Sequence, residues 1–234
     1  MLEIPVHVVD VVMRWEQVEQ PHTVLAGEPR WYTPDEQRRV DRAALAELDA
    51  RGLLDNGAVD EEFRAWMGVL ARPSAEFYGW LTMPDGLVGV LVASGPGLAV
   101  LAVREEETLW LRGMRPESLA ETLVRQLPEV PPGRGRSINV AESELDADQP
   151  EATRLASLLA EPRSSVGQLC TAVRDELGRR HRTTRPLTYL DVTPDRPAHG
   201  RWMTQTHAGW VIAAPAGEQA LVTRLNEMHR ELVG

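Results

Sequence analysis

The feature that most constrains the fold is a row of four short apolar segments separated by only a few residues. Residues 75–83 and 87–94 are joined by a Pro-Asp-Gly sequence that is typical of a turn. Residues 98–103 and 107–112 follow after further short turns. Parallel strands need a crossover of a dozen or more residues, so strands this closely spaced must pair antiparallel. The sequence therefore predicts an antiparallel sheet and not a parallel doubly wound one.

A second set of strands is expected in the C-terminal part of the chain, and both sets are flanked by amphipathic helices. The strands of the second set are predicted at 186–192, 200–205 and 208–214. The helices are predicted at 34–50, 61–71, 116–127, 150–160 and 217–231. Both parts read helix, antiparallel strands, helix, which indicates a weak internal duplication of element order. We expect one antiparallel sheet that takes strands from both parts.

The start of the chain shows two helix signals of different quality. Thr33-Pro34-Asp35-Glu36 combines a capping threonine, a proline at the first helical position and a glutamate at the third. It predicts a helix over 34–50 that Gly52 ends. Before it, residues 4–9 read as a strand, followed by a helix to about residue 19 with Asp10 as a candidate N-cap.

A proline- and glycine-rich segment at 128–136 is the clearest break in the chain. The length of 234 residues suits one sizeable domain or two small halves that share a core. We therefore expect a single domain over 1–234, with halves of about 1–130 and 137–234. After the break, a short strand is expected at 137–140.

Residues 166–174 fit two structures. Leu169, Thr171 and Val173 alternate as in a strand, whereas Leu169, Val173 and Leu177 have helical spacing. Periodicity alone does not separate these alternatives.

Charge and cysteine content exclude several classes of protein. A formal net charge of -10 argues against nucleic-acid binding, which needs a basic surface. The single cysteine, Cys170, excludes an internal disulfide and a cysteine-based metal site. The N-terminal residues lack the basic segment followed by an apolar one that is typical of a signal peptide. No apolar run approaches the roughly 20 residues of a membrane span. These features indicate a soluble cytoplasmic protein.

The sequence lacks the motifs of catalysis and of cofactor binding. The histidines show no zinc-site spacing, and no G-x-S-x-G nucleophile motif occurs; the histidines stand at 7, 22, 181, 199, 207 and 229. Gly95-Pro96-Gly97 joins two strands and so lacks the geometry of a dinucleotide site. We expect no catalytic residue, no metal and no cofactor. We also expect no deep pocket in which two or more of a set of five candidate residues converge: His181, His199, His207, Cys170 and Asp191.

Two further segments could bind a ligand or a partner, but each also has a purely structural interpretation. The segment Gly133–Ser137 has enough donors to hold an anion, but an exposed hinge is the simpler interpretation. The basic run Arg179–Arg182, with Arg185 after it, is interpreted as a solvated turn that could meet an acidic partner.

The aromatic residues favour a binding protein. Seven of the twelve are tryptophan, the others being three Tyr and two Phe. Tryptophan is enriched at interface hot spots, and Trp31 stands in a loop before a helix cap, where exposure is expected. Leu155, Leu158 and Leu159 form a stripe that is either one wall of a partner groove or a face packed on the sheet.

Several segments together resemble the EspG family of type VII secretion chaperones. They include Pro21–Leu25, Gly52-Leu53-Leu54 and Pro131–Ser137. The C-terminal quarter carries most of the resemblance: Gly167-Gln168, Leu187–Asp191, Gly200-Arg201-Trp202, Gly209-Trp210-Val211 and Pro215.

The resemblance implies an α+β fold, with a central antiparallel sheet flanked by helical bundles and a quasi-two-fold arrangement of two similar halves. It favours a strand at 166–174. It also implies a cytoplasmic chaperone that binds the PPE subunit of a PE–PPE heterodimer, or a WXG100-like helical hairpin, and that directs this substrate to secretion. The partner-binding candidates are Leu155, Leu158, Leu159 and Trp31. The turn at 84–86 is tighter than the corresponding loop of some members.

Two other functions stay open. One is an enzyme of unrecognised type that uses Asp191 and Arg201, which end and begin neighbouring predicted strands and so could pair. The other is a plain dimerisation module.

Overall fold

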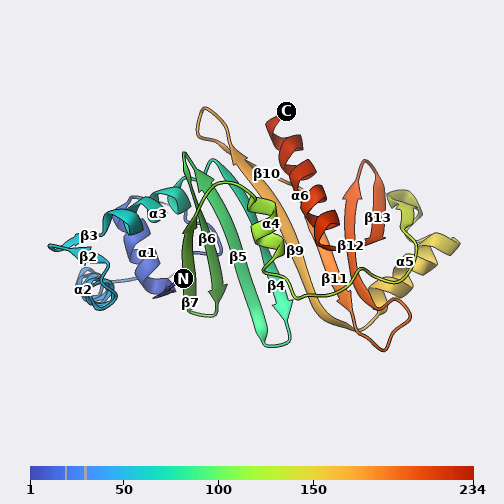
Figure 1. Ribbon diagram of the computed structural model, residues 1–234, viewed down its shortest axis with the longest axis horizontal. Helices are drawn as coiled ribbons and strands as arrows, with labels where there is room; N and C mark the ends of the chain where they lie inside the picture. The colour runs from blue at the N-terminus through green and yellow to red at the C-terminus, as the bar shows by residue number, and fades with distance from the viewer. Residues whose placement is uncertain (19, 29–30) are drawn as a thin grey trace. The chain divides into compact units, whose positions relative to one another are not determined.

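A computed structural model describes residues 1–18, 20–28 and 31–234 (Figure 1). The chain forms two compact units. The first contains Met1–Glu76 and Gly89–Leu119, and the second contains Phe77–Val88 and Ala120–Gly234. Each unit combines helices with antiparallel strands, so the predicted α+β class is confirmed. The quasi-two-fold arrangement stays a prediction.

The first unit holds four strands of an antiparallel sheet in the order β1-β7-β6-β5. Helix α3 packs against β6, and α1 contacts both α2 and α3. The elements are β1 (Leu2–Pro5), α1 (Val6–Trp15), α2 (Pro34–Ala50), β2 (Leu54–Asp55), β3 (Ala58–Val59), α3 (Glu61–Ala71), β5 (Gly86–Gly95), β6 (Leu98–Glu105) and β7 (Thr108–Met114).

The second unit holds strands in the order β4-β9-β11-β12-β13-β8, with β10 paired to β9. Strand β4 comes from the N-terminal part of the sequence and β9 from the C-terminal part. One antiparallel sheet therefore takes strands from both parts, as predicted. The elements are β4 (Ala75–Met83), α4 (Leu119–Val124), β8 (Ile138–Ala141), η1 (Glu142–Glu144), α5 (Pro150–Ala160), β9 (Arg163–Arg174), β10 (Arg180–Arg182), β11 (Leu187–Val192), β12 (Gly200–His207), β13 (Trp210–Pro215) and α6 (Glu218–Val233).

The capping box before α2 is confirmed, whereas the boundary predicted near Asp10 is wrong. The Glu36 N–H donates to the Thr33 hydroxyl, and the Glu36 carboxylate accepts the Thr33 N–H at 2.8 Å. The first strand ends at Pro5, and α1 begins at Val6, so Asp10 lies inside this helix. Its carboxylate accepts the Gly27 N–H at 3.0 Å from both oxygens. Asp10 therefore ties the loop before α2 to α1 and does not cap a helix.

The ambiguous segment 166–174 is a strand, because residues 166–169 pair with β11 and residues 172–174 pair with β10. Leu169 lies opposite Leu187, and Gly167 lies opposite Tyr189. A Cβ atom at Gly167 would lie 2.6 Å from the Tyr189 ring, so only glycine leaves room for this buried side chain. The Tyr189 hydroxyl and the Ser165 hydroxyl share a hydrogen bond of 2.8 Å.

The basic run is a strand and not a turn, which corrects the interpretation from sequence. Strand β10 pairs with β9 in a hairpin, and Asp175 holds the connection between them. The Asp175 carboxylate accepts hydrogen bonds from the side chain of Arg179 and pairs with His181, both at 2.9 Å. The hydrogen bond to His181 is the largest cause that lowers the pKa of Asp175 to about 2.

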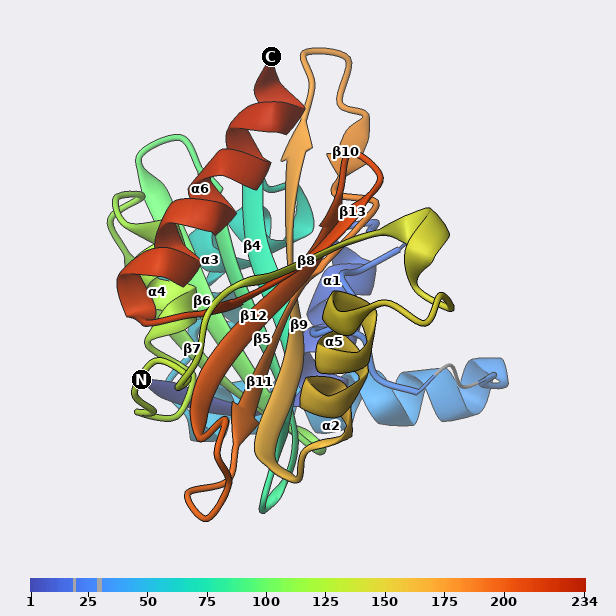
Figure 2. The ribbon, with the colours of Figure 1, turned by 90° about the vertical axis from the view of Figure 1, so that its right-hand side faces the viewer.

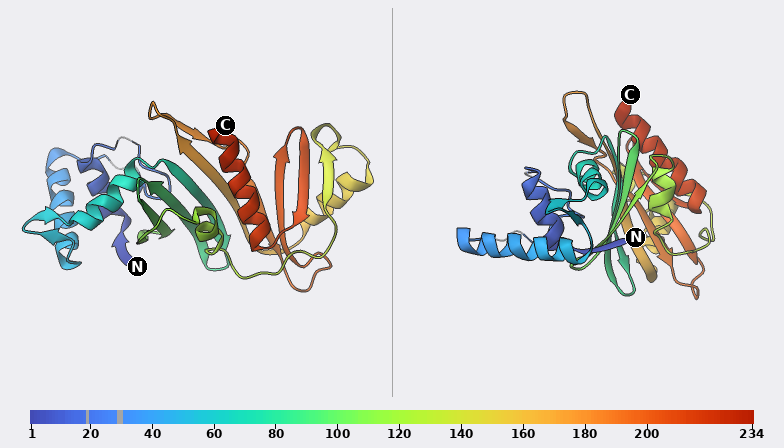
Figure 3. Two further views of the ribbon diagram at one scale, coloured as in Figure 1. Left: turned by 45° about the horizontal axis from the view of Figure 1, so that its top comes forward. Right: turned by 60° about the vertical axis from the view of Figure 1, so that its left-hand side comes forward.

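The two longer helices of the second unit cover opposite faces of its sheet (Figure 2). Helix α6 packs on β9, whereas α5 packs on β8. Strand β8 is the last strand of this sheet and lies on the outer side of β13, where it is the short yellow strand of Figure 3.

One half-buried histidine makes the packing of α6 sensitive to pH. The His229 ring packs against the Phe77 ring in a tilted arrangement with 5.1 Å between centroids, and its Nδ1 has no hydrogen-bond partner in the described part of the chain. Burial lowers the pKa of His229 from 6.5. The neutral ring is favoured in the folded state, so this contribution to stability is complete above pH 6.5 and is lost as pH falls through the lowered pKa.

We expect His229→Phe to remove this part of the pH dependence. Unfolding by urea at pH 5 and at pH 7.5 measures it. The loss of stability between the two pH values should be smaller in the variant than in the wild type. An equal loss in both proteins would contradict the assignment, and His199→Phe serves as the control for removal of a histidine that does not belong to α6.

Candidate partner-binding surfaces

Helix α5 presents only one of its three candidate leucines to solvent. Leu155 and Leu158 are 3% and 4% exposed, and Leu159 is 41% exposed. The two buried side chains join a core with residues of β8, β11, β12 and β13: Ile138, Val140, Leu190, Val192, Trp202 and Ala213. The leucine stripe is therefore mainly a face packed on the sheet, and of the three only Leu159 is available to a partner.

Trp31 is almost fully exposed, at 94%. It stands two residues before the Thr33 cap, so the rigid start of α2 fixes the chain that follows it. Among the residues of α2, only Ala44 and Leu48 are buried. Among the described residues, Trp31 is the most exposed large apolar side chain of the first unit, so it offers apolar area to a partner.

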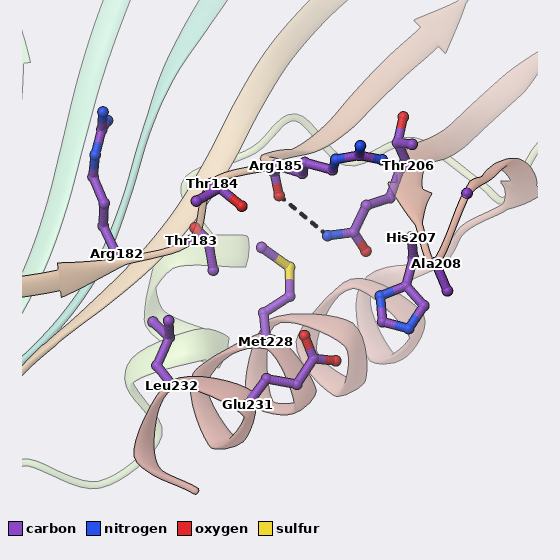
Figure 4. Close-up of a pocket in the computed structure, with 12 residues that line it drawn as sticks. Arg182, Thr183, Thr184, Arg185, Thr206, His207, Ala208, Met228, Glu231 and Leu232 are labelled. Carbon is purple, nitrogen blue, oxygen red and sulfur yellow. Dashed lines mark hydrogen bonds between the residues drawn. The ribbon is translucent and has the colours of Figure 1, made fainter. Parts of the chain in front are cut away.

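A pocket of about 380 Å³ lies beside the C-terminal turns of α6 (Figure 4). Met228 and Leu232 line it from the helix, and the β12–β13 turn and the chain before β11 complete its wall. The lining residues are Arg182, Thr183, Thr184, Arg185, Gln205, Thr206, His207, Ala208, Gly209, Met228, Glu231 and Leu232. Sequence reasoning missed this pocket, because it depends on the tertiary position of α6 against the β12–β13 hairpin.

Hydrogen bonds fix one wall of this pocket. The Gln205 side-chain amide donates to the Arg185 carbonyl at 3.3 Å (Figure 4), and Arg224 donates to the Gln205 side-chain oxygen. Arg224 also pairs with Glu227 and Glu231. The pocket thus combines two apolar side chains with a polar rim, in which Glu231 pairs with Arg224.

Asp191 and Arg201 form a buried ion pair. They lie directly opposite each other on β11 and β12, with side chains 0% and 4% exposed. The guanidinium donates to both carboxylate oxygens, from Nε at 2.7 Å and from Nη2 at 2.8 Å. It also donates to the Pro128 carbonyl at 2.8 Å and lies over the Tyr189 ring at 5.0 Å. The predicted pairing is confirmed. Because each group's charge is compensated within the core, the arrangement is structural.

The proline- and glycine-rich segment is exposed, as predicted, but hydrogen bonds tie its backbone to β12, so it is not a free hinge. The Gly133 N–H donates to the Arg201 carbonyl, and the Arg201 N–H donates to the Pro131 carbonyl, both at 2.7 Å. A Cβ atom at Gly133 would lie 2.2 Å from Nε1 of Trp202, so the indole needs glycine here. That same Nε1 donates to the Ala198 carbonyl at 2.8 Å.

The other chemical candidates do not share a site. His181 pairs with Asp175, and His207 lies 3.5 Å from Arg224. Cys170 is half-buried, and burial raises the pKa of its thiol. Among residues 1–18, 20–28 and 31–234, no group of three or more His, Cys, Asp or Glu side chains is placed to hold a metal ion. Within the same residues, no helix has the length and apolar character to cross a membrane.

The sequence model of the EspG family matches residues 5–227 of this chain. The chain belongs to the EspG family. The predicted resemblance is therefore confirmed. The fold is similar to that of the Mycobacterium tuberculosis type VII secretion system chaperone EspG5, solved in complex with the PE25-PPE41 dimer. The TM-score is 0.73 at 16% identity, and the match covers 97% of this chain and 96% of that chain. No protein of curated function matches this EspG protein.

Most of the C-terminal residues that carry the family resemblance hold the second unit together. Gly167 makes room for Tyr189, and Asp191 and Arg201 form the buried pair. Gly200 has a φ of +111°, and a Cβ atom there would lie 2.6 Å from the Pro132 carbonyl. These residues therefore stabilise the fold of this chain and do not form an exposed contact surface.

Neighbouring leucines of α5 give a matched test of the helix orientation. We expect Leu158→Ala to lower the free energy of unfolding by about 2–5 kcal/mol, because it opens a cavity in the core. Leu159→Ala should change it by about 0.5 kcal/mol or less, the usual result at a largely exposed position. Chemical denaturation of both variants measures the difference. Equal losses would show that α5 is rotated from the orientation described.

A second test concerns the buried pair. We expect Asp191→Ala to destabilise the fold by about 3–5 kcal/mol, because it leaves the Arg201 charge buried without a carboxylate. The double variant Asp191→Leu with Arg201→Met should recover much of this loss, since it leaves no buried charge. A double variant that is less stable than Asp191→Ala would contradict this account. Thermal unfolding of the three proteins gives the comparison.

Proposed function

We propose that this protein is a type VII secretion chaperone that binds a PE–PPE heterodimer, or a WXG100-like hairpin, and keeps it soluble before export. The observation that carries the proposal is the family match over residues 5–227, together with a fold similar to EspG5 over nearly the full length of both chains. The EspG5 structure is itself a complex with a PE–PPE dimer.

The chaperone acts as a binding protein and not as an enzyme, and it acts as a single EspG-like domain. The buried Asp191–Arg201 pair supports the first statement, because both charged groups are used within the core. The single Cys170 fits a reducing compartment, so we place the protein in the cytoplasm, where secretion substrates are held before export.

The partner is held by apolar side chains that the fold leaves exposed. Helical hairpins bury apolar tips against complementary surfaces, and aromatic anchors supply much of the energy. Trp31 and Leu159 are the exposed members of the predicted set. Leu155 and Leu158 support the proposal indirectly, because their burial fixes the face of α5 that presents Leu159.

We expect Trp31→Ala and Leu159→Arg each to weaken binding of the co-expressed substrate pair by about tenfold or more, as loss of a hot-spot contact does. Size-exclusion chromatography of the purified mixture shows whether the partners co-elute, and circular dichroism confirms the fold of each variant. Leu177→Arg, which places the same charge at a 76% exposed leucine of the β9–β10 hairpin, is the control.

Two results would count against parts of this proposal. If the wild-type pair never co-elutes and the substrate is equally soluble alone, the chaperone function is wrong. If the wild type binds and both variants bind equally well, the function stands and the two contact residues are wrong.

A further inference from the structure

Strand β8 is an exposed edge whose sequence is complementary to itself. It ends the sheet of the second unit, and in Figure 2 it runs across the sheet edge that faces the viewer. The sequence Arg-Ser-Ile-Asn-Val-Ala-Glu over 136–142 is centred on Asn139. The residues next to Asn139 on either side are both β-branched and apolar, Ile138 and Val140. The residues after these are both small, Ser137 and Ala141.

The charged residues complete this symmetry. One further step from Asn139 reaches Arg136 on one side and Glu142 on the other, and both side chains are exposed. Native proteins protect edge strands with like charges, prolines or bulges. Here the residues that flank β8 (Ile138–Ala141) carry opposite charges, Arg136 two residues before the strand and Glu142 directly after it, which suits a second copy in antiparallel orientation.

The backbone has the same symmetry. The Glu142 N–H donates to the Gly209 carbonyl at 2.8 Å, so the even-numbered residues of β8 direct their backbone groups toward β13. Alternation along the strand turns the groups of Ser137, Asn139 and Ala141 to the open edge. A two-fold axis at Asn139 pairs Ser137 of one copy with Ala141 of the other, so the outward-facing residues meet one another.

We propose that this protein forms a homodimer in which two β8 strands pair antiparallel about Asn139. Arg136 of each copy then lies directly opposite Glu142 of the other, on the same face of the joined sheet. Glu142 already pairs with Arg185 at 3.1 Å, but both side chains of that pair are exposed, so its energy is small and the carboxylate accepts a second guanidinium.

Neighbouring apolar residues favour this occupant. Trp210 and Ile212 of β13 are 49% and 37% exposed and lie opposite Ala141 and Asn139. Trp210 lies opposite Ala141, and in the dimer Ala141 lies opposite Ser137 of the second copy. The second copy therefore extends the sheet surface beside the Trp210 indole. The pairing is isologous, so it uses both β8 edges and closes after two copies. The short strand predicts a weak dimer.

Charge reversal tests the pairing without disturbing the core. Sedimentation velocity is recorded for the wild type up to about 1 mM, a range that detects a pair with a Kd near this value. We expect a monomer–dimer equilibrium that Arg136→Glu and Glu142→Arg each weaken by about tenfold, since each reversal places like charges opposite each other twice. The double variant with both reversals should restore the wild-type equilibrium.

Two further variants keep the result specific. Asn139→Pro removes an N–H that faces the open edge and should abolish the dimer while thermal unfolding stays cooperative. Arg39→Glu makes the same charge change on the exposed surface of α2 and should leave the equilibrium unchanged. A wild type that stays monomeric, or a dimer that survives Arg136→Glu and Asn139→Pro, would overturn the proposal.

Discussion

The Arg201 guanidinium is the group through which three segments of the second unit are fixed together. It binds Asp191 on β11, it belongs to β12, and it donates to the Pro128 carbonyl at the start of the proline- and glycine-rich segment. The same residue binds this segment through its backbone N–H and carbonyl. A buried guanidinium is tolerated only when its donors are satisfied, so the positions of the strands and of the segment depend on one another.

This constraint explains the glycines around it. Trp202 follows Arg201 and is packed on the other face of β12 against Gly133, and Gly200 brings the chain close to Pro132. The result is a segment of low helix and strand propensity that is nevertheless ordered along β12. It leads directly into β8, so the sheet edge that we propose as a dimer contact is positioned by the buried pair.

Features of the fold that depend on residues close together in the sequence were predicted, whereas features that depend on distant residues were not. The Thr33–Glu36 capping box and the stripe of Leu155, Leu158 and Leu159 placed their helices, because these patterns lie within about one turn of the chain. Asp10 was misjudged because its partner, Gly27, is 17 residues away. The strand at β10 was missed because its pairing with β9 depends on the turn that Asp175 organises. Position 19 and positions 29–30, beside the predicted end of the first helix and Trp31, lie outside the described residues.

The candidate surfaces followed the same rule. Exposure of Trp31 was predictable from its place in a loop before a cap, whereas the burial of Leu158 beside the exposed Leu159 required the position of α5 on β8.

The central claim is that the chain holds a PE–PPE pair. Isothermal titration of this protein with a purified PE–PPE heterodimer from the same host tests it most directly. The account predicts one chaperone per heterodimer with a Kd of roughly micromolar to nanomolar, about 8 to 12 kcal/mol of binding free energy. Absence of binding heat at every temperature tried, together with separate elution of the two components, would contradict it.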